Sequence, residues 1–237
     1  MQESHENALN NPIFKIISEA AEELSVDCYV IGGFVRDYFL GRTIPKDIDV
    51  VAIGSGIKLA ENIASKLKGN PQVSVFKNFG TAMIKNEGIE LEFVGARKES
   101  YQRDSRKPIV EDGTLEDDQK RRDFTINALA LSLNKKNFGK LLDPFNGIAD
   151  IESQIIKTPL EPGITYSDDP LRMMRAIRFA TQLDFQIALP SLQAITEHKD
   201  RLNIVSNERI LDELHKIMLC KKPSLGFALL HKTGLLE

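Results

Sequence analysis

Residues 28–53 read CYVIGGFVRDYFLGRTIPKDIDVVAI, with two short apolar runs on either side of a glycine pair. The runs at 28–31 and 48–53 predict buried strands, because both are short, rich in β-branched residues and bounded by turn residues. Between them, residues 34–40 have apolar side chains at helical spacing and are followed by a glycine, a common end signal for helices. The segment therefore predicts a strand, a helix and a second strand, with Gly32-Gly33 at the first junction.

Two carboxylates open the second of these strands. Asp47 and Asp49 are two residues apart, and alternate side chains of a strand point to the same face. Oxygen-rich pairs suit Mg²⁺, which proteins commonly hold with one or two carboxylates plus substrate phosphates. Two such ions about 3.5–4 Å apart can activate an attacking hydroxyl and stabilise a leaving pyrophosphate. Taken alone, the Asp-x-Asp pattern also fits an exposed acidic turn.

The neighbours of this pair favour a phosphate site. Gly32-Gly33 would let the backbone approach a phosphate at the start of a helix, and Arg36 lies one turn further on. The P-loop pattern with its lysine is absent, so an ordinary ATPase phosphate loop is not predicted. A third acid comes from the predicted strand 89–94, where Glu92 would be costly against a packed core unless it were used. The alternative, an exposed face of an edge strand, explains Glu90 better than Glu92.

The rest of the chain divides near residue 148. Before it, residues 97–119 are polar and lack periodicity, which predicts a long mobile loop. After it, strand signals disappear and the pattern is helical. The further elements expected before residue 148 are helices at 12–25 and 57–67, strands at 73–76, 81–85 and 89–94, an ordered stretch at 124–133 and a short strand and turn at 141–145. The helices expected after it are 149–155, 168–183, 188–198, 207–219 and 224–231.

Composition predicts an ordinary globular protein. The chain has 237 residues, 42% of them hydrophobic, and a formal net charge of −3. Its apolar runs are far shorter than a membrane span of ~20 residues, and the N-terminus does not resemble a secretory signal. The chain has only two cysteines, and neither belongs to a metal-ligand spacing. So few cysteines fit a protein of the reducing cytoplasm. The net charge does not exclude a local basic groove for nucleic acid, because binding depends on where the charge lies.

The motifs together resemble the class II nucleotidyltransferases, the family of CCA-adding tRNA nucleotidyltransferases and bacterial poly(A) polymerases. The resemblance covers roughly residues 28–219, and the ordered set is far more specific than any one motif. It rests on Gly32–Asp37, Leu40–Arg42, Asp47–Val51, Glu92–Arg97, Arg121–Ala130, Asp143–Gly147, Asp168–Phe179 and Glu208–Lys216.

The resemblance implies an α+β fold in two domains. Residues 1–148 would form a polymerase-β-like nucleotidyltransferase head with a mixed sheet and helices. Residues 149–237 would form an all-helical neck that selects the nucleotide. The family continues into helical body and tail domains, so we expect further C-terminal domains to be missing from this chain.

The resemblance also implies roles for individual residues of the head. Asp47 and Asp49 would hold the catalytic Mg²⁺ ions, with Glu92 as the third catalytic carboxylate. The remaining head residues would bind the nucleotide: Gly32, Gly33 and Arg36 at the triphosphate, Arg122 at a phosphate, Asp123 at the ribose 2′-OH that marks a ribonucleotide, and Asn127 in support.

Nucleotide choice would belong to the helix predicted over 168–183. Asp169 and Arg172 lie three apart, hence on one helix face, and offer acceptors and a planar donor fork that can address a base edge. Arg175 and Arg178 continue the stripe and would reach the triphosphate or the RNA end. An amphipathic helix with a solvated basic face is the alternative. Asp168 stands where the family often has Glu, but the second acid, Asp169, is the one that would address the base, so base selection should survive this departure.

The expected activity is template-independent addition of CCA to the 3′ end of tRNA from CTP and ATP, with release of pyrophosphate. A poly(A) polymerase, or a CC-only or A-only enzyme of the same family, would share nearly every motif. A catalytically inactive RNA-binding module on the same scaffold is the alternative from another class. The expected partners are tRNA and the two nucleotides, with no membrane, and the oligomeric state stays open.

Overall fold

The structure is a computed structural model that describes residues 4–43, 45–77, 80–102 and 105–236, with the backbone alone for 99–110. The chain forms two compact units. One division lies between Gly147 and Ile148, near the expected boundary, but two earlier segments belong to the second unit. The assignment of a head at 1–148 and a neck at 149–237 stays a prediction. Unit 1 comprises Met1–Lys98, Val110–Gln119 and Asn127–Gly147, and unit 2 comprises Glu99–Ile109, Lys120–Ile126 and Ile148–Glu237.

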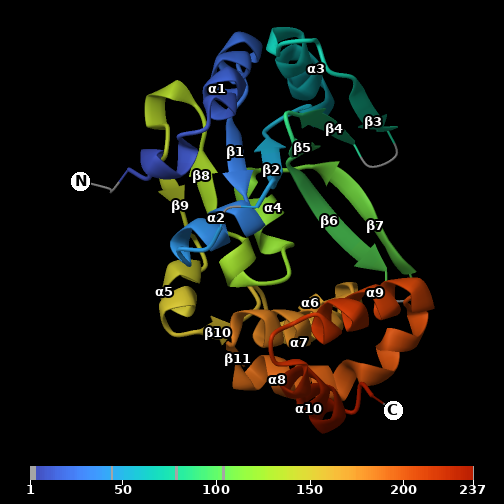
Figure 1. The fold of residues 1–237 in the computed structure, drawn as a ribbon. Helices are drawn as coiled ribbons and strands as arrows, with labels where there is room; N and C mark the ends of the chain where they lie inside the picture. Colours follow the sequence, from blue (N-terminus) through green and yellow to red (C-terminus); the bar gives the residue numbers. More distant parts are fainter. Residues whose placement is uncertain (1–3, 44, 78–79, 103–104, 237) are drawn as a thin grey trace. The chain divides into compact units, whose positions relative to one another are not determined.

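Within the described residues, unit 1 contains a seven-stranded mixed sheet in the order β3-β4-β5-β2-β1-β8-β9 (Figure 1). The pairing of β2 with β5 is parallel, and the other neighbouring pairs are antiparallel. The mixed sheet expected from the sequence is therefore confirmed. The strands are β1 (Cys28–Ile31), β2 (Asp47–Ala52), β3 (Val73–Phe76), β4 (Thr81–Asn86), β5 (Ile89–Gly95), β8 (Ala130–Ser132) and β9 (Leu141–Leu142).

The burial of β2 alternates along its first half. Ile48 and Val50 are buried, whereas Asp47 is exposed and Asp49 half-buried, as expected for a strand with one face packed throughout. On the face that carries Asp49, Val51 packs with Ile31 and other residues in a buried cluster. The helices of this unit are α1 (Pro12–Leu24), α2 (Gly33–Phe39), α3 (Gly56–Lys66), α4 (Leu115–Lys120) and the start of α5 (Gly147–Glu152), with short 3₁₀ turns η1 (Glu6–Leu9), η3 (Thr125–Asn127, shared with unit 2) and η4 (Lys135–Asn137).

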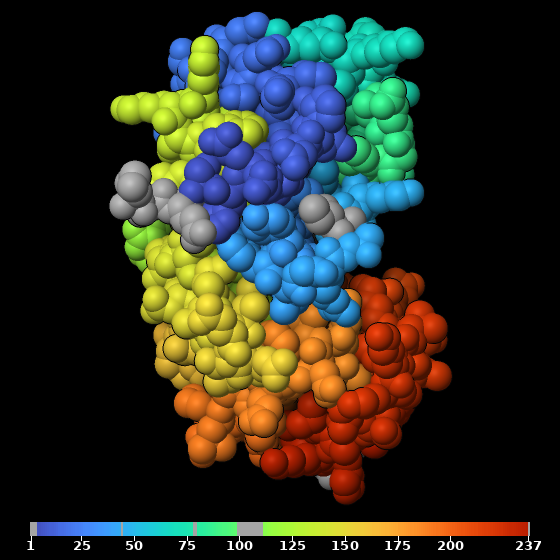
Figure 2. Space-filling view, turned by 60° about the vertical axis from the view of Figure 1, so that its left-hand side comes forward, coloured from blue at the N-terminus to red at the C-terminus, as the bar shows by residue number. Residues whose placement is uncertain are grey.

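The N-terminal segment packs onto the surface of unit 1. Ser4 forms a β-bridge with Lys140, and the His5 N–H donates to the Gly139 carbonyl at 2.9 Å. The His5 ring packs edge-on against Phe39 of α2, with ring centroids 4.9 Å apart. Figure 2 shows this segment, in dark blue, beside the yellow-green chain around residue 140. The start of the chain thus restrains the helix that follows the glycine pair.

The mobile loop expected over residues 97–119 is wrong. The chain there forms β6 (Arg97–Gln102) and β7 (Ser105–Asp112), which pair as a two-stranded sheet, followed by α4. Residues 103 and 104, between the two strands, lie outside the described residues. The segment has no apolar alternation, so periodicity did not predict these strands. A signal for α4 does exist: Thr114 and Asp117 cap its first turn reciprocally, with Asp117 Oδ2 accepting from the Thr114 N–H at 2.9 Å and Thr114 Oγ1 accepting from the Asp117 N–H at 3.2 Å.

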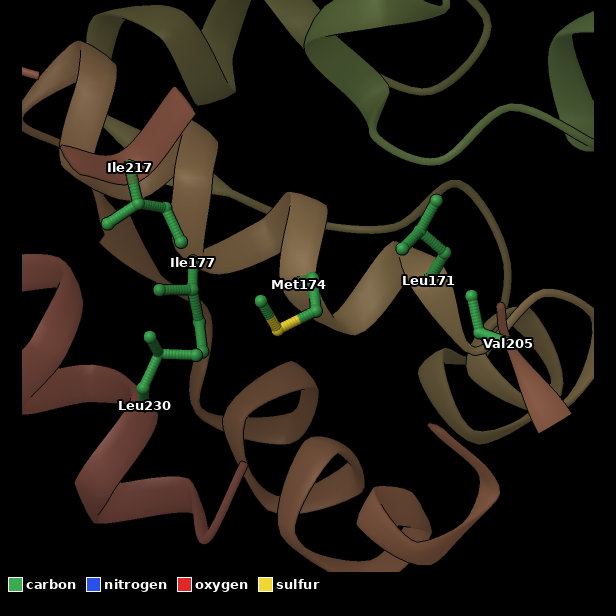
Figure 3. Close-up of a cluster of buried hydrophobic side chains, with 6 residues drawn as sticks. All are labelled: Leu171, Met174, Ile177, Val205, Ile217 and Leu230. Carbon is green, nitrogen blue, oxygen red and sulfur yellow. The ribbon is translucent and has the colours of Figure 1, made fainter. Parts of the chain in front are cut away.

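Unit 2 is helical apart from a two-residue parallel strand pair and its part of the ribbon. The helix α7 has one buried face, formed by Leu171, Met174 and Ile177. These residues pack with Ile217 of α9, with Leu230 of α10 and with Val205, which lies just before α9 (Figure 3). This apolar face fixes the rotation of α7 about its axis. The elements are β10 (Ile155–Ile156), α6 (Pro162–Asp168), α7 (Leu171–Leu183), β11 (Gln186–Ile187), α8 (Leu189–His198), η5 (Lys199–Ile204), α9 (Asn207–Met218) and α10 (Pro223–Thr233).

The helix expected over 168–183 begins later, at Leu171, and Asp168 is the last residue of a separate helix, α6. Asp169 has an extended conformation, with φ −135° and ψ 98°, and lies between the end of α6 and the start of α7. Pro170 explains the break, because a proline disfavours the helical conformation in the residue before it. Sequence reasoning missed α6, whose first N–H groups at Gly163 and Ile164 are capped by Glu161. No described helix is long and apolar enough to cross a membrane.

Candidate functional site

The register of the sheet brings four acids to one face of two neighbouring strands. Asp47 lies opposite Glu90, and Asp49 lies opposite Glu92, in the parallel pairing of β2 with β5. Residues paired in this way point to the same side of the sheet. Glu90 forms an ion pair with Lys85 of β4 at 2.8 Å, which gives it a partner outside the acid set. Glu92 is therefore the acid of β5 that stands beside Asp49.

Two expectations about Glu92 need correction. Its side chain is exposed, so it does not face a packed core, and β5 lies between β2 and β4 and is no edge strand. Exposure lets its carboxylate contact a ligand from outside. The described residues contain no group of three or more His, Cys, Asp or Glu that could hold a metal ion by itself.

The glycine pair lies directly beside these acids. Ile31, the last residue of β1, is opposite Asp49, so the chain turns at Gly32 next to the start of β2. Gly32 has φ 82° and ψ −135°, a conformation open almost only to glycine. Its N–H donates to the Leu129 carbonyl at 3.2 Å, which ties the turn to the segment that leads into β8.

Arg36 is a buried brace rather than an outward-pointing side chain. Its Nε and Nη2 donate to the two carboxylate oxygens of Asp37 at 2.9 and 3.0 Å, and its Nη1 donates to Asn127 Oδ1 at 2.8 Å. Its side chain is only 7% exposed. The structure thus joins two residues expected at the nucleotide, Arg36 and Asn127, and adds Asp37, to which no role was given from the sequence. A direct triphosphate contact by Arg36 stays a prediction.

Asp169 lies just before α7 and acts as part of its start. Its Oδ1 accepts from the Leu171 N–H at 3.3 Å, and its carbonyl accepts from the Arg172 N–H at 3.0 Å. Its Oδ2 lies 3.9 Å from Arg209 of α9. Arg172 Nη2 donates to the Arg121 carbonyl at 2.6 Å. The two residues are neighbours, although not through the helical spacing expected.

Arg175 and Asp123 form a tight pair in unit 2. Nε and Nη2 of Arg175 donate to Asp123 Oδ2 at 2.8 and 2.6 Å. Asp123 is buried, and the next residue in the chain, Phe124, donates its N–H to Asp123 Oδ1 at 2.9 Å. The Asp123 carboxylate is the main cause that raises the pKa of Arg175. Arg122, which precedes Asp123, is half-buried.

Arg178 lies inside the unit, so a solvated basic face does not describe it. Its Nε donates to Glu213 Oε2 at 2.5 Å, and its guanidinium carbon lies 3.9 Å from the centre of the Phe179 ring. Burial lowers the pKa of Arg178, and Glu213 opposes that effect. Glu213 is itself buried and also lies 3.3 Å from Lys216 and 3.9 Å from Arg175. Sequence reasoning gave Glu213 no role, although it stands on the apolar face of α9, three residues after Ile210 and four before Ile217.

These features define a nucleotidyltransferase-like head, with acids and a glycine turn at one place in a mixed sheet, and a helical unit with an ordered arginine stripe. The family model described as the poly(A) polymerase head domain matches residues 28–157. The chain therefore belongs to this family, and the resemblance to class II nucleotidyltransferases is confirmed. A second model, described as the probable RNA and SrmB-binding site of polymerase A, matches residues 184–237.

Relatives with several named activities are similar to this chain. A CCA-adding enzyme of Pediococcus pentosaceus is 36% identical over 225 residues, 94% of this chain and 54% of that protein. An A-adding tRNA nucleotidyltransferase of Aquifex aeolicus is 42% identical over 160 residues, 68% of this chain and 19% of that protein. A CC-adding tRNA nucleotidyltransferase of Halalkalibacterium halodurans is 36% identical, over 93% of this chain and 52% of that protein. The chain thus spans from about a fifth to about half of these relatives.

Solved structures of the same class share the fold. A CCA-adding enzyme in an apo form matches with a TM-score of 0.88 and 30% identity, over all of this chain and 57% of that one. A tRNA nucleotidyltransferase complexed with a primer tRNA and an incoming ATP analogue matches with a TM-score of 0.81 and 31% identity, over 93% of this chain and 61% of that one. The expected fold class, a polymerase-β-like head followed by a helical part, is confirmed.

Proposed function

We propose that this chain carries the catalytic and nucleotide-selecting parts of an enzyme that adds CCA to the 3′ end of tRNA from CTP and ATP. The observation that carries the proposal is the parallel register of β2 with β5, which sets Asp49 beside Glu92 next to the Gly32 turn. In the reaction, the terminal ribose hydroxyl of the RNA attacks the α-phosphate of the nucleotide, and pyrophosphate leaves. Relatives named for CCA addition, and the structure of a tRNA nucleotidyltransferase with a primer tRNA and an ATP analogue, support this choice of substrates.

We propose Mg²⁺ as the cofactor, held by Asp47 and Asp49. The fit rests on the two carboxylates at alternate positions of one strand, both accessible from outside, with Glu92 in register beside them. Mg²⁺ is usually held by one or two carboxylates together with substrate phosphates, so a pair of aspartates is the contribution expected from the protein. When bound, the ions would neutralise charge on the phosphates and activate the attacking hydroxyl.

The remaining roles fall to the other residues expected at the nucleotide. Gly32 and Gly33 would let the triphosphate approach the backbone. The contact of Arg36 with Asn127 would support the helix that follows these glycines. Arg122 would bind a phosphate and Asp123 the ribose, while Asp169 and Arg172 would select the base without a template. Catalysis would then be mainly positioning and charge neutralisation, as in phosphoryl transfer generally. Two free cysteines in the described residues support a reducing, cytoplasmic location for the protein.

Nucleotide incorporation tests the activity. The chain would be incubated with a tRNA that ends at the discriminator base and with CTP, ATP or both. Addition of two C residues from CTP and of a final A only when ATP is also present supports the proposal. Long tails from ATP alone would show a poly(A) polymerase. Products that stop after CC would show a CC-only enzyme. Addition of A only to a tRNA that already ends in CC would show an A-only enzyme, and both activities are named for relatives of this chain.

Removal of the carboxylates tests the metal assignment. Asp47→Ala and Asp49→Ala should abolish addition, because charge on the phosphates is no longer neutralised, while CTP binding measured without metal stays largely intact. Lys85→Ala, which removes the ion-pair partner of Glu90 on the neighbouring strand, is the control and should keep activity. Extension of tRNA by the double aspartate variant would exclude this assignment. A wild-type chain that binds tRNA but incorporates nothing would instead favour the inactive RNA-binding module.

A further inference from the structure

Three hydrogen bonds fix the orientation of the Asp123 carboxylate. Oδ2 accepts from both Nε and Nη2 of Arg175, and Oδ1 accepts from the Phe124 N–H. The Asp123 side chain is 8% exposed, so it has little room to adopt another rotamer. A carboxylate held in this way has a fixed orientation.

Arg175 is itself held from two sides. Its Nη1 lies 3.9 Å from Glu213 Oε1, and its guanidinium carbon lies 5.4 Å from the centre of the Phe179 ring. The apolar face of α7, with Leu171, Met174 and Ile177, prevents the helix from turning and carrying Arg175 away (Figure 3). The edge of the guanidinium that bears Nε and Nη2 is committed to Asp123. The arginine is therefore better placed to position that carboxylate than to bind a phosphate.

We propose that Arg175 is a positioning residue for sugar selection: it orients Asp123 so that the carboxylate accepts a hydrogen bond from the ribose 2′-OH of the incoming nucleotide. The inference rests on the proposed function, which assigns the ribose to Asp123. It replaces the expectation that Arg175 reaches the triphosphate or the RNA end. A residue that holds a ligand-binding group in its productive geometry contributes to selectivity without touching the substrate.

Sugar discrimination measures this role directly. The affinities of the chain for CTP and for 2′-deoxy-CTP would be compared by calorimetry at one Mg²⁺ concentration, without RNA. A hydrogen bond to a charged group is worth enough for the wild type to prefer CTP by about tenfold or more. Arg175→Ala should bring this ratio close to one while CTP affinity falls only to that of the deoxynucleotide. Arg175→Lys keeps the charge but cannot donate both hydrogen bonds in the same geometry. It should reduce the ratio of CTP affinity to 2′-deoxy-CTP affinity at least about threefold.

A matched control separates orientation from charge. Lys216→Ala also removes one positive charge and one contact with Glu213, but Lys216 contacts Asp212 and Glu213 rather than Asp123. Its ratio should equal that of the wild type. Thermal melts of all variants would establish that they fold. If Arg175→Ala does not fold, Arg175→Lys still provides the test.

The outcomes distinguish this inference from the proposed function. If Arg175→Ala weakens CTP and 2′-deoxy-CTP equally, Arg175 contacts the triphosphate and the inference is overturned. If the wild type shows no preference, or if Asp123→Ala keeps it, the ribose contact itself is absent and the inference fails, while nucleotidyl transfer stands. A wild-type chain that binds neither nucleotide would contradict the proposed function as a whole.

Discussion

Two of the arginines expected at the nucleotide are buried and are held by carboxylates. Arg36 and Arg178 each donate to a carboxylate within their own unit, Asp37 and Glu213 respectively. The sequence identified the arginines because they fall in motifs, but it could not identify their partners. A carboxylate 35 residues away, as Glu213 is from Arg178, becomes a partner only through packing. The acids at Asp47 and Asp49 were easier to predict, because strand alternation alone sets them on one face.

The Arg36 brace should matter for stability. Arg36→Ala would leave Asp37 and Asn127 without their buried donor, and breaking a buried pair costs about 3 kcal/mol of unfolding free energy. Urea denaturation followed by circular dichroism would measure the loss. Lys66→Ala removes the more exposed pair of Lys66 with Glu23 and should cost less than about 1 kcal/mol. Equal losses in the two variants would mean that Arg36 is no brace.

Arg172 should govern the choice of base. Its guanidinium is anchored on the Arg121 carbonyl, and its N–H donates to the Asp169 carbonyl. Arg172→Ala should therefore reduce the preference for CTP and ATP over GTP and UTP by roughly tenfold, about 1.4 kcal/mol, and reduce turnover less. Incorporation rates with each nucleotide would show this. Arg201→Ala is the control, because Arg201 also donates its Nη2 to a backbone carbonyl, that of Ser167 at 2.9 Å. Unchanged selectivity in the Arg172 variant would place base selection elsewhere.

At the scale of elements, apolar periodicity predicted the packed parts of the molecule. The expected strand at 28–31 and the helix starting near residue 12 agree with β1 and α1. Failures occurred where apolar periodicity is weak: the β6–β7 ribbon has a polar sequence, and α6 is short and capped by a glutamate, although it buries Tyr166. The break at Asp169 had a signal in Pro170, which was outweighed by the apolar spacing that follows it.

The packing of α10 provides a test at this scale. A Cβ built on Gly226 would lie 2.5 Å from Cγ2 of Ile217 and 2.8 Å from Oγ1 of Thr181, both on neighbouring helices. Gly226→Ala should therefore destabilise unit 2 by about 1–2 kcal/mol, because the overpacking exceeds the gain in helix propensity. Calorimetric melting would measure the change. Ser224→Ala, at an exposed position of the same helix, should be nearly neutral, and a more stable Gly226→Ala variant would contradict the close approach.

At the scale of the whole molecule, the change of pattern near residue 148 lies close to one of several divisions between the two units, but the strand order was not visible in the sequence. Pairing of β2 with β5 across an intervening helix and two strands is a tertiary choice that local patterns do not encode. Local patterns also did not predict that residues 120–126 belong to unit 2. They do so because Phe124 packs against Phe179, far along the chain, with ring centroids 5.6 Å apart. The family resemblance supplied the fold that periodicity alone left open.

The two thiols should report on global unfolding. Cys28 is fully buried in β1, and burial raises its pKa to about 12, so it stays protonated and inaccessible at pH 8. Cys220 is half-buried, and burial raises its pKa as well. Ellman's reagent should therefore label one thiol in the native chain and the second only in denaturant. Cys220→Ser should leave no thiol that reacts before unfolding, and native labelling of that variant would contradict the burial.

The parallel pairing of β2 with β5 also has a consequence for synthesis of the protein on the ribosome. A nascent chain that ends before Ile89 already contains both aspartates, but β2 has no partner on that side. An unpaired strand edge with apolar residues such as Val50 and Val51 is a site for association with other chains. The carboxylates at the start of β2 keep part of this edge charged until β5 emerges. The acids proposed to bind metal in the folded enzyme would thus also protect the nascent chain from aggregation.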